Sequence, residues 1–377
     1  MADPVSTDEG LSGRAKRRRT MIIVGTILAI IGIVWWISRS RYNDSVASSS
    51  SQSSSNAVQG TIDVSTLAAG AAPAIGYADH GTVHLADGSV VKAPGRGALT
   101  GFTELTGGTM VYLTQQQHTS SVEVVEKGGK HFGPYPTASV LAVNTGHTLA
   151  AWLAPDGTPT TWQNGLKKPI SLPQPIPGSN LRMAAVTGTS CSHGATCRVF
   201  ATSWKDTTPS GWVVSSTGGL SHADPQKRLI TIRDATDTGQ LVGYTVVRTN
   251  GTCSGLVDEG ASGKPQVFQT CNHTLDSFSP NGSYVSGGPD VNSGPGQRGV
   301  AIYDASGGEL VRQDLAHNDA GFLQTKQWED NSHVLFPLFQ NDTWSVVRLA
   351  VDGTMQTAVK PVSGTSDQTP FVLETTP

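Results

Sequence analysis

The sequence has few charged residues and, beyond residue 40, no segment with the periodicity of a long helix. Asp, Glu, Lys and Arg make up only 15% of the 377 residues. No stretch there keeps the spacing of three and four residues that gives a helix one apolar face. Glycine, in contrast, occurs 43 times and proline 21 times. Short apolar runs between frequent turn-forming residues are typical of strands, so the composition predicts an all-β protein.

The common motifs of hydrolases and nucleotide-binding proteins are also missing. The sequence contains no G-x-S-x-G, no H-E-x-x-H and no P-loop. His80 and His84 are four residues apart, but on a strand such residues are about 13 Å apart and do not share a metal. We therefore predict no catalytic residue, no cofactor and no cofactor-binding residue.

One loop carries a candidate cation site. In DVNSG, Asp290 and Asn292 alternate as oxygen ligands do at the start of a calcium loop. An EF-hand also needs a carboxylate at its twelfth position, which here is Ala301. Asp290 and Asn292 are kept as candidate calcium ligands, and the alternative is a Gly- and Pro-rich connection between two strands.

Positive charge is scarce outside the N-terminus. Beyond residue 44 the chain carries 19 Lys and Arg against 25 Asp and Glu. A protein that binds nucleic acid neutralises phosphates with a basic surface, and a net charge of about −6 does not provide one. Nucleic acid is therefore excluded as a partner.

The sequence contains one long apolar run, an uncharged segment at residues 20–38. As a helix it would span about 28 Å, close to the hydrocarbon thickness of a bilayer. Arg14 and the basic residues 16–19 precede it, and only Arg39 and Arg41 follow. The positive-inside rule then predicts a cytoplasmic tail at 1–19 and a transmembrane signal anchor at 20–38, with the remaining chain outside the plasma membrane. A cleaved signal peptide is the alternative, but no A-x-A site follows directly.

A serine-rich segment follows the predicted span. Seven of the eight residues at 48–55 are serine, and such a segment cannot build an apolar core. We therefore predict a flexible stem at 39–70 that links the membrane to an extracytoplasmic domain at 71–377.

The sequence has only four cysteines, and all of them follow the predicted span. They form two pairs, each of which brackets a turn-rich stretch. Disulfides persist outside the cytoplasm, so we predict the bridges Cys191–Cys197 and Cys253–Cys271. The alternative is a metal site, because His193 lies inside the first pair and His273 follows the second, but these spacings do not match a zinc site.

Strand pairs with Gly-containing turns recur along the domain. Four strands per unit, repeating every 38–48 residues, are typical of the blades of a β-propeller. A partial unit at 74–94 lacks one strand, and the apolar run PFVLE at 370–374 would supply it and close the ring. We predict a seven-bladed propeller closed by N- and C-terminal strands, with six or eight blades or a pair of β-sandwiches as alternatives. The complete units are 98–133, 137–173, 180–226, 228–273, 274–319 and 322–362.

Two segments of one unit resemble a known group of propellers. FSPNGSYV at 278–285 resembles the F-S-P-D-G blade start of WD40-like and TolB-like propellers, with Asn281 where Asp is usual. VAIYDASGGEL at 300–310 resembles the strand and turn that end such a blade. The Gly-His and Trp-Asp signature of strict WD40 repeats is absent. The layout of basic tail, span, Ser-rich stem and disulfide-bearing propeller resembles membrane-anchored envelope proteins of high-GC Gram-positive bacteria.

These observations predict a membrane-anchored, non-catalytic binding or scaffolding module in the cell envelope. Propellers bind partners at loops on one face or at the channel mouth, so an envelope protein, a peptide or a polysaccharide is the expected ligand. One alternative is an envelope hydrolase or lyase, which requires carboxylates, Arg and Tyr to converge in the channel with perturbed pKa values. Another is a ligand sensor coupled to a membrane partner.

Overall fold

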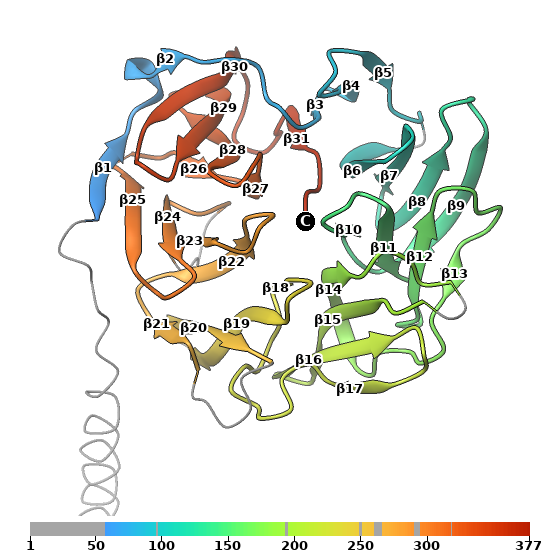
Figure 1. Cartoon of the computed structure of the whole chain (residues 1–377). Coiled ribbons are helices and arrows are strands. Elements are labelled where there is room, and N and C mark those ends of the chain that lie inside the picture. Colours follow the sequence, from blue (N-terminus) through green and yellow to red (C-terminus); the bar gives the residue numbers. More distant parts are fainter. Residues whose placement is uncertain are drawn as a thin grey trace, which may run out of the picture. The chain divides into compact units, whose positions relative to one another are not determined.

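Seven sheets stand around a central axis in the part of the chain that the structure describes (Figure 1). Each sheet is one blade, and the blades are numbered 1 to 7 from the N-terminal end. The predicted all-β, seven-bladed propeller is therefore confirmed. The structure is a computed structural model, and it describes residues 57–95, 97–192, 195–248, 251–259, 266–289, 295–317 and 319–377.

Blades 2 to 5 each consist of four antiparallel strands that follow one another in the chain. Figure 1 shows the first strand of each of these blades nearest the centre. Their bounds agree with the repeat units predicted from the sequence to within about six residues. The strands are β6 (Ala98–Leu105), β7 (Thr109–Gln116), β8 (Thr119–Val125), β9 (His131–Thr137), β10 (Ala142–Val143), β11 (Leu149–Leu153), β12 (Pro159–Gln163), β13 (Ile170–Ser171), β14 (Ser179–Thr187), β15 (Arg198–Lys205), β16 (Thr208–Ser215), β17 (Leu220–His222), β18 (Asp234–Ala235), β19 (Gln240–Arg248), β20 (Gly251–Asp258) and β21 (Phe268–Thr270).

Blades 6 and 7 have the same order of strands, and the first position of blade 7 is shared by two short strands, β26 and β27, that both pair with β28. The strands are β22 (Thr274–Phe278), β23 (Tyr284–Gly288), β24 (Gly299–Asp304), β25 (Glu309–Leu315), β26 (Phe322–Leu323), β27 (Gln327–Trp328), β28 (His333–Gln340), β29 (Thr343–Ala350) and β30 (Met355–Ser363).

Both ends of the propeller domain contribute to blade 1. β31 (Phe371–Leu373) pairs antiparallel with β3 (Tyr77–Asp79), and Ala78 lies opposite Val372. The sheet continues through β4 (Thr82–His84) to β5 (Val90–Lys92). The predicted closure by PFVLE is confirmed, and it leaves no gap between the first and last blades.

The N-terminal strands of the described chain differ from the prediction. Residues 57–70, which the sequence assigned to the flexible stem, form β1 (Val58–Ile62), the 3₁₀ helix η1 (Val64–Thr66) and β2 (Ala68–Ala69). β1 pairs parallel with β25 of blade 6, and β2 pairs parallel with β30 of blade 7. The prediction missed them because they pair through the backbone at a sheet edge, so within β1 only Ile62 is buried and no alternating apolar pattern marks the strand.

The predicted tail at 1–19 and span at 20–38 lie outside the described residues, as does the stem up to residue 56. Within the described part of the chain, no helix has the length and apolar character needed to cross a membrane.

The core consists of seven apolar clusters, one at each interface between neighbouring blades. Each cluster combines the buried strand residues of two blades, so no blade has an apolar core of its own. Four tryptophans supply the largest buried side chains of these interfaces, and each is 1% exposed or less. They are Trp152, Trp162, Trp328 and Trp344.

The turn between β22 and β23 shows how the sequence starts a blade. Ser279 and Gly282 close the turn, because the Gly282 N–H donates to the Ser279 carbonyl at 2.7 Å. Gly282 has φ +72°, a conformation that L-residues rarely adopt. The Asn281 side-chain oxygen accepts hydrogen bonds from Ser283 N and Ser279 Oγ. An Asp side chain would accept the same two bonds, which explains why Asn can stand here in place of the usual Asp. Phe278, directly before the turn, lies in the core and is 2% exposed.

Both predicted disulfides are confirmed. Cys191 and Cys197 are bonded across the loop between β14 and β15, with their Cα atoms 5.0 Å apart. Cys253 in β20 is bonded to Cys271 directly after β21, with a Cα separation of 4.1 Å. His273, the histidine of the alternative metal site, instead lies buried with its Nδ1 at hydrogen-bond distance from the Tyr303 hydroxyl. His193 lies outside the described residues.

Candidate functional site

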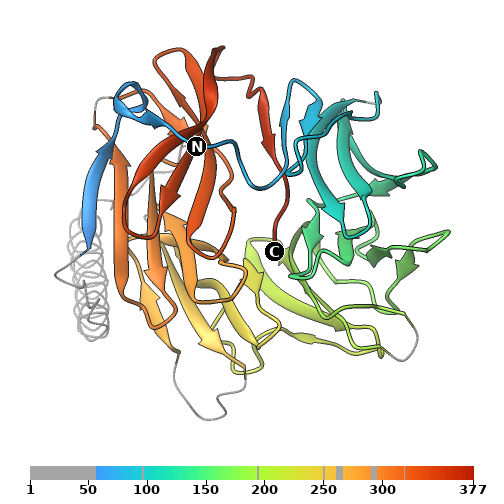
Figure 2. The same ribbon diagram turned by 45° about the horizontal axis from the view of Figure 1, so that its top comes forward.

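A cavity of about 520 Å³ lies at the centre of the propeller, lined by residues of blades 3 to 7 and by residues 375–377. Figure 2 shows the last residues of the chain running into the middle of the ring. The lining residues lie on or beside β10, β14, β18, β22 and β26, which are the innermost strands of five successive blades. The cavity therefore exists only because the ring closes, and we call it the channel cavity.

Charged side chains from four successive blades meet in the wall of the channel cavity. Arg182 comes from β14, Arg233 directly precedes β18, Asp276 lies in β22, and Lys326 directly precedes β27. They occupy similar places near the start of each blade, so closure of the ring brings them together. We call these four residues the channel cluster.

Asp276 is the centre of the channel cluster. Its Oδ1 accepts a hydrogen bond from Arg233 Nη2 at 2.8 Å, and its Oδ2 lies 2.7 Å from Lys326 Nζ. Burial opposes ionisation of this carboxyl, but the charges and hydrogen bonds of Lys326 and Arg233 outweigh it and lower the pKa of Asp276. Asp276 is therefore ionised at neutral pH and holds both cations in place.

The two paired cations are also fixed by uncharged neighbours. The Arg233 guanidinium lies over the Tyr244 ring, 5.7 Å from its centroid. The Lys326 ammonium, whose side chain is only 3% exposed, donates a hydrogen bond to Gln297 Oε1. Gln297 in turn donates to Thr274 Oγ1. The polar wall of the cavity is thus a connected network with defined geometry.

Arg182 differs from the other members of the channel cluster. It is solvent-exposed, and no residue that the structure describes forms an ion pair or hydrogen bond with its guanidinium. Desolvation by the cavity wall and then the charge of Arg233 lower its pKa, but a guanidinium stays protonated at any physiological pH. Arg182 therefore presents to the channel cavity a permanent positive charge that no described residue pairs with.

A second aspartate, Asp234, lies in the wall beside Arg233 and connects two blades. Its Oδ2 accepts from Phe278 N of blade 6 and its Oδ1 from Ala235 N of its own blade, both at 2.7 Å. Burial raises the pKa of Asp234 to about 7, although these two N–H groups and Arg233 favour the charged form. Near pH 7 this carboxyl is partly protonated.

The raised pKa of Asp234 predicts a specific pH dependence of stability. The folded protein binds this proton up to about pH 7, but an unfolded Asp loses it near pH 3.9. Stability therefore falls as pH rises between these values, and from pH 5 to 8 the loss should be about 2–3 kcal/mol. The variant Asp234→Asn cannot ionise at this position. Urea unfolding at pH 5 and pH 8 should therefore show that the free energy of unfolding of the wild type, relative to that of the variant, decreases by this amount.

The titration of His273 does not affect this comparison of the wild type with Asp234→Asn. Burial lowers its pKa, which makes stability rise with pH up to about 6.5, the opposite sign. Because both proteins contain His273, its effect cancels in the difference. A constant difference between the two proteins from pH 5 to 8 would show that Asp234 is already ionised at pH 5.

The remaining wall of the channel cavity combines apolar residues with uncharged polar ones such as Thr145, Gln324 and Thr325. Val140, which is 54% exposed, stands before β10, and Leu141 follows it. Met183 lies next to Arg182 in β14, and Leu323 lies in β26. A concave site that offers both apolar and convergent polar groups can hold a small ligand.

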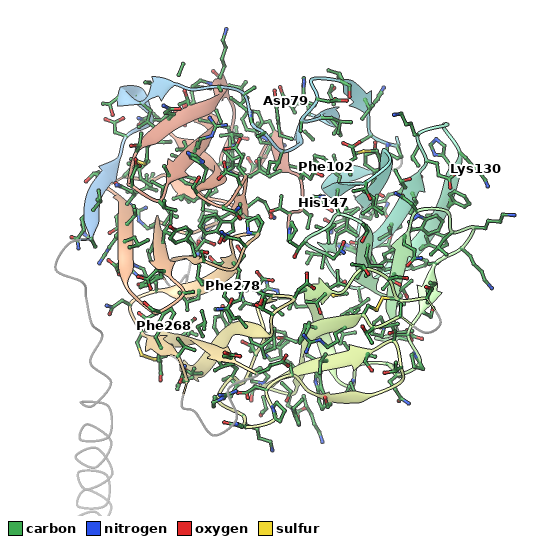
Figure 3. All side chains as sticks on the ribbon, in the orientation of Figure 1. Asp79, Phe102, Lys130, His147, Phe268 and Phe278 are labelled. Carbon is green, nitrogen blue, oxygen red and sulfur yellow. A yellow bond between two sulfur atoms is a disulfide. The ribbon has the colours of Figure 1, made fainter. Side chains whose placement is uncertain are left out.

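The carboxylates on the opposite side of the ring join blades rather than line the cavity. Glu374 accepts from Gly76 N at 2.7 Å and from Glu104 N at 2.8 Å, so one side chain connects blades 1 and 2. His147 Nδ1 lies 3.1 Å from the Glu104 carbonyl oxygen. Figure 3 shows His147 beside the centre of the ring and Lys130 at its outer rim.

The sequence did not identify the channel cluster. The candidate calcium ligands Asp290 and Asn292 lie outside the described residues, so that hypothesis stays a prediction. A signal for the cluster was nevertheless present, because Arg182, Asp276 and Lys326 all fall within the first five residues of a predicted repeat unit, where the innermost strand begins. A charged residue near the start of an otherwise apolar inner strand is thus a sequence signal for a residue that lines the channel.

Comparison with known proteins gives matches at the level of fold. No family model matches the chain, and no curated protein is significantly similar to it. Similar solved structures include YCF48 bound to D1 peptide, with 9% identity, coverage of 83% of this chain and 98% of that one, and a TM-score of 0.49. The Cps50 (Swd1) β-propeller domain of Myceliophteria thermophila has 11% identity, coverage of 71% and 88%, and a TM-score of 0.45.

A TolB-like protein from Agrobacterium tumefaciens is also similar, with 11% identity, coverage of 62% of this chain and 86% of that one, and a TM-score of 0.41. Such identities and scores carry no argument about function. The chain is a seven-bladed β-propeller, and that conclusion rests on its own seven sheets.

Proposed function

We propose that the protein is a membrane-anchored, extracytoplasmic β-propeller that acts as a non-catalytic binding module through its channel cavity. The observation that carries this proposal is the cavity itself, whose wall combines apolar side chains with the fixed channel cluster. Five blades contribute to it, and ion pairs of Asp276 with Arg233 and Lys326 fix part of its wall. A preformed pocket of this size suits a small molecule or a short segment of a partner.

The engagement of the cavity's carboxylates supports binding over catalysis. Asp276 is held by two cations, and both oxygens of Asp234 accept backbone hydrogen bonds. A general base needs a free oxygen directed at a substrate proton. The Ser277 hydroxyl, which lies next to Asp276, is at hydrogen-bond distance from Ser286 Oγ rather than from either carboxylate. These groups therefore maintain the geometry of the pocket.

Location outside the membrane is proposed from the sequence and is consistent with the disulfides. The uncharged segment at 20–38 and the basic residues before it supply the anchor and its orientation. Disulfides persist in the compartment on the far side. Alkaline extraction should leave the full-length chain in the membrane, and protease added to intact cells should degrade the propeller. A variant without residues 1–38 serves as the control and should not sediment with membranes.

Binding at the channel cavity can be tested by photo-cross-linking in native membranes. A photoreactive phenylalanine derivative at Val140 places the probe at the cavity rim. The matched control carries the same probe at Val90, which is 56% exposed in β5 and does not line the cavity. We expect adducts from position 140 and none of the same mass from position 90. Identical adducts from both positions would contradict binding at the cavity.

A hydrolase or lyase in the channel is the second candidate function, favoured by one observation. Asp234, with a pKa of about 7, stands beside Arg233 in the cavity wall, and a carboxyl of this pKa can exchange protons at neutral pH. This function requires that Asp234→Asn abolish turnover of an envelope polysaccharide or peptide while the variant still binds it. The binding-module proposal requires no turnover by either protein.

A further inference from the structure

The channel cluster carries more positive than negative charge. Asp276 balances one of the three cations Arg182, Arg233 and Lys326. Asp234, partly ionised at pH 7, offsets a fraction of a second one. Among the side chains of the cavity wall, an excess of between one and two positive charges therefore remains, and a bound anion would neutralise it.

We propose that the channel cavity binds a carboxylate, held by the Arg182 guanidinium with Arg233 beside it, and that an aliphatic group of the same ligand packs on the apolar wall. This inference rests on the proposed function as a binding module and names the chemistry of its ligand. A guanidinium matches a carboxylate with two parallel N–H···O hydrogen bonds. Arg182 is free to form them, because none of its donors is used by a described residue.

The surroundings of Arg182 favour this contact in two ways. Arg233 cannot turn away from the cavity, because Asp276 and the Tyr244 ring hold it. The positive potential at Arg182 therefore exists before the ligand arrives, and no side chain has to be reordered to produce it. Arg182 itself is exposed, so its desolvation on binding is repaid by a charge-assisted hydrogen bond.

The size of the charge excess favours a monoanion over a phosphate. One carboxylate would bring the cluster close to neutrality, and a phosphate dianion would leave excess negative charge near Asp276. Val140, which is 54% exposed at the rim, adds a preference for an aliphatic neighbour of the carboxylate. This chemistry is found in a free aliphatic acid and in the C-terminal end of an apolar peptide.

The test measures binding of three probes to the full-length chain in mild detergent by isothermal titration calorimetry. The probes are hexanoate, the peptide acetyl-Ala-Val-Leu with a free C-terminal carboxylate, and the same peptide as its amide. We expect the free-acid peptide or hexanoate to bind at least tenfold more tightly than the amide. Tighter binding of hexanoate identifies a small acid as the ligand, and tighter binding of the peptide identifies a chain end.

Substitution of Arg182 assigns the binding to the proposed residue. Arg182→Gln should weaken binding of the carboxylate probe by tenfold or more and leave the amide unaffected. Arg182→Lys, which keeps the charge but loses the two-pronged geometry, should give an intermediate affinity. The melting temperature should stay within about 2 °C in both variants, because Arg182 is exposed and unpaired. Arg312→Gln, which breaks the surface pair with Asp314 outside the cavity, is the matched control and should bind as wild type.

Equal affinity for acid and amide, no binding of either acid, or unchanged binding by Arg182→Gln would overturn the proposal. Each of these results is distinguishable from failure of the proposed function. A specific adduct at position 140 together with no carboxylate binding would retain the binding module and reject its ligand class. Absence of both would reject the two together.

Discussion

Deletion of residues 370–377 is expected to abolish the cooperative unfolding transition of the propeller. The deletion removes β31, and with it the strand that joins the first blade to the last. The edge of β3 and one side of blade 7 would then be exposed to solvent. Phe371 and Leu373, buried at 2% and 7% exposure, leave the cluster between blades 7 and 1. Differential scanning calorimetry should show a broad, weakened transition or none.

A point variant tests the same closure with a smaller disturbance. Phe371→Ala leaves a cavity at the interface between blades 7 and 1 and should cost about 3–5 kcal/mol. The matched control is Val372→Ala in the same strand, a partly buried residue that should cost about 1 kcal/mol. Equal losses for the two variants would indicate that the strand acts through its backbone pairing alone and not through the interface.

The closing strand was predictable because its signal is local. PFVLE is a short apolar run after a polar stretch, and the partial unit at 74–94 lacked one strand. β1 and β2 were missed for the opposite reason. They attach by parallel backbone pairing to the outer edges of blades 6 and 7, and backbone hydrogen bonds do not require a particular side-chain pattern. Their exposed residues therefore resemble the polar stem that precedes them.

The candidate site could not be assembled from the sequence because it depends on closure of the whole ring. Arg182 and Lys326 are 144 positions apart, yet both line one cavity. The repeat period predicts which strands are innermost, and this would place charged residues at the channel. It does not predict which of them pair, because pairing depends on side-chain directions within each blade. That Asp276 binds Arg233 and Lys326 and leaves Arg182 free is information that the structure adds.

The same network predicts the second large effect. Asp276→Ala should destabilise the propeller by about 3–5 kcal/mol, because it leaves both the Lys326 ammonium, whose side chain is 3% exposed, and the Arg233 guanidinium without their counter-charge. The double variant Asp276→Ala/Lys326→Met removes both members of the pair. It should recover the part of the loss that comes from Lys326, since a buried ion pair is worth little more than apolar side chains of similar size, while Arg233 remains without its partner. Urea unfolding of the wild type, both single variants and the double variant gives the coupling energy.

The outcome of this cycle also bears on why the cluster is charged. If the double variant is as stable as the wild type, the Lys326–Asp276 pair is not needed for folding, and its value lies in the field that it helps to set at Arg182. Asp276→Ala should then weaken binding of the carboxylate probe, because Asp276 no longer holds Arg233 at the cavity. A double variant as unstable as Asp276→Ala would contradict this view, because the loss would then come from the unpaired Arg233 guanidinium and not from the Lys326 ammonium.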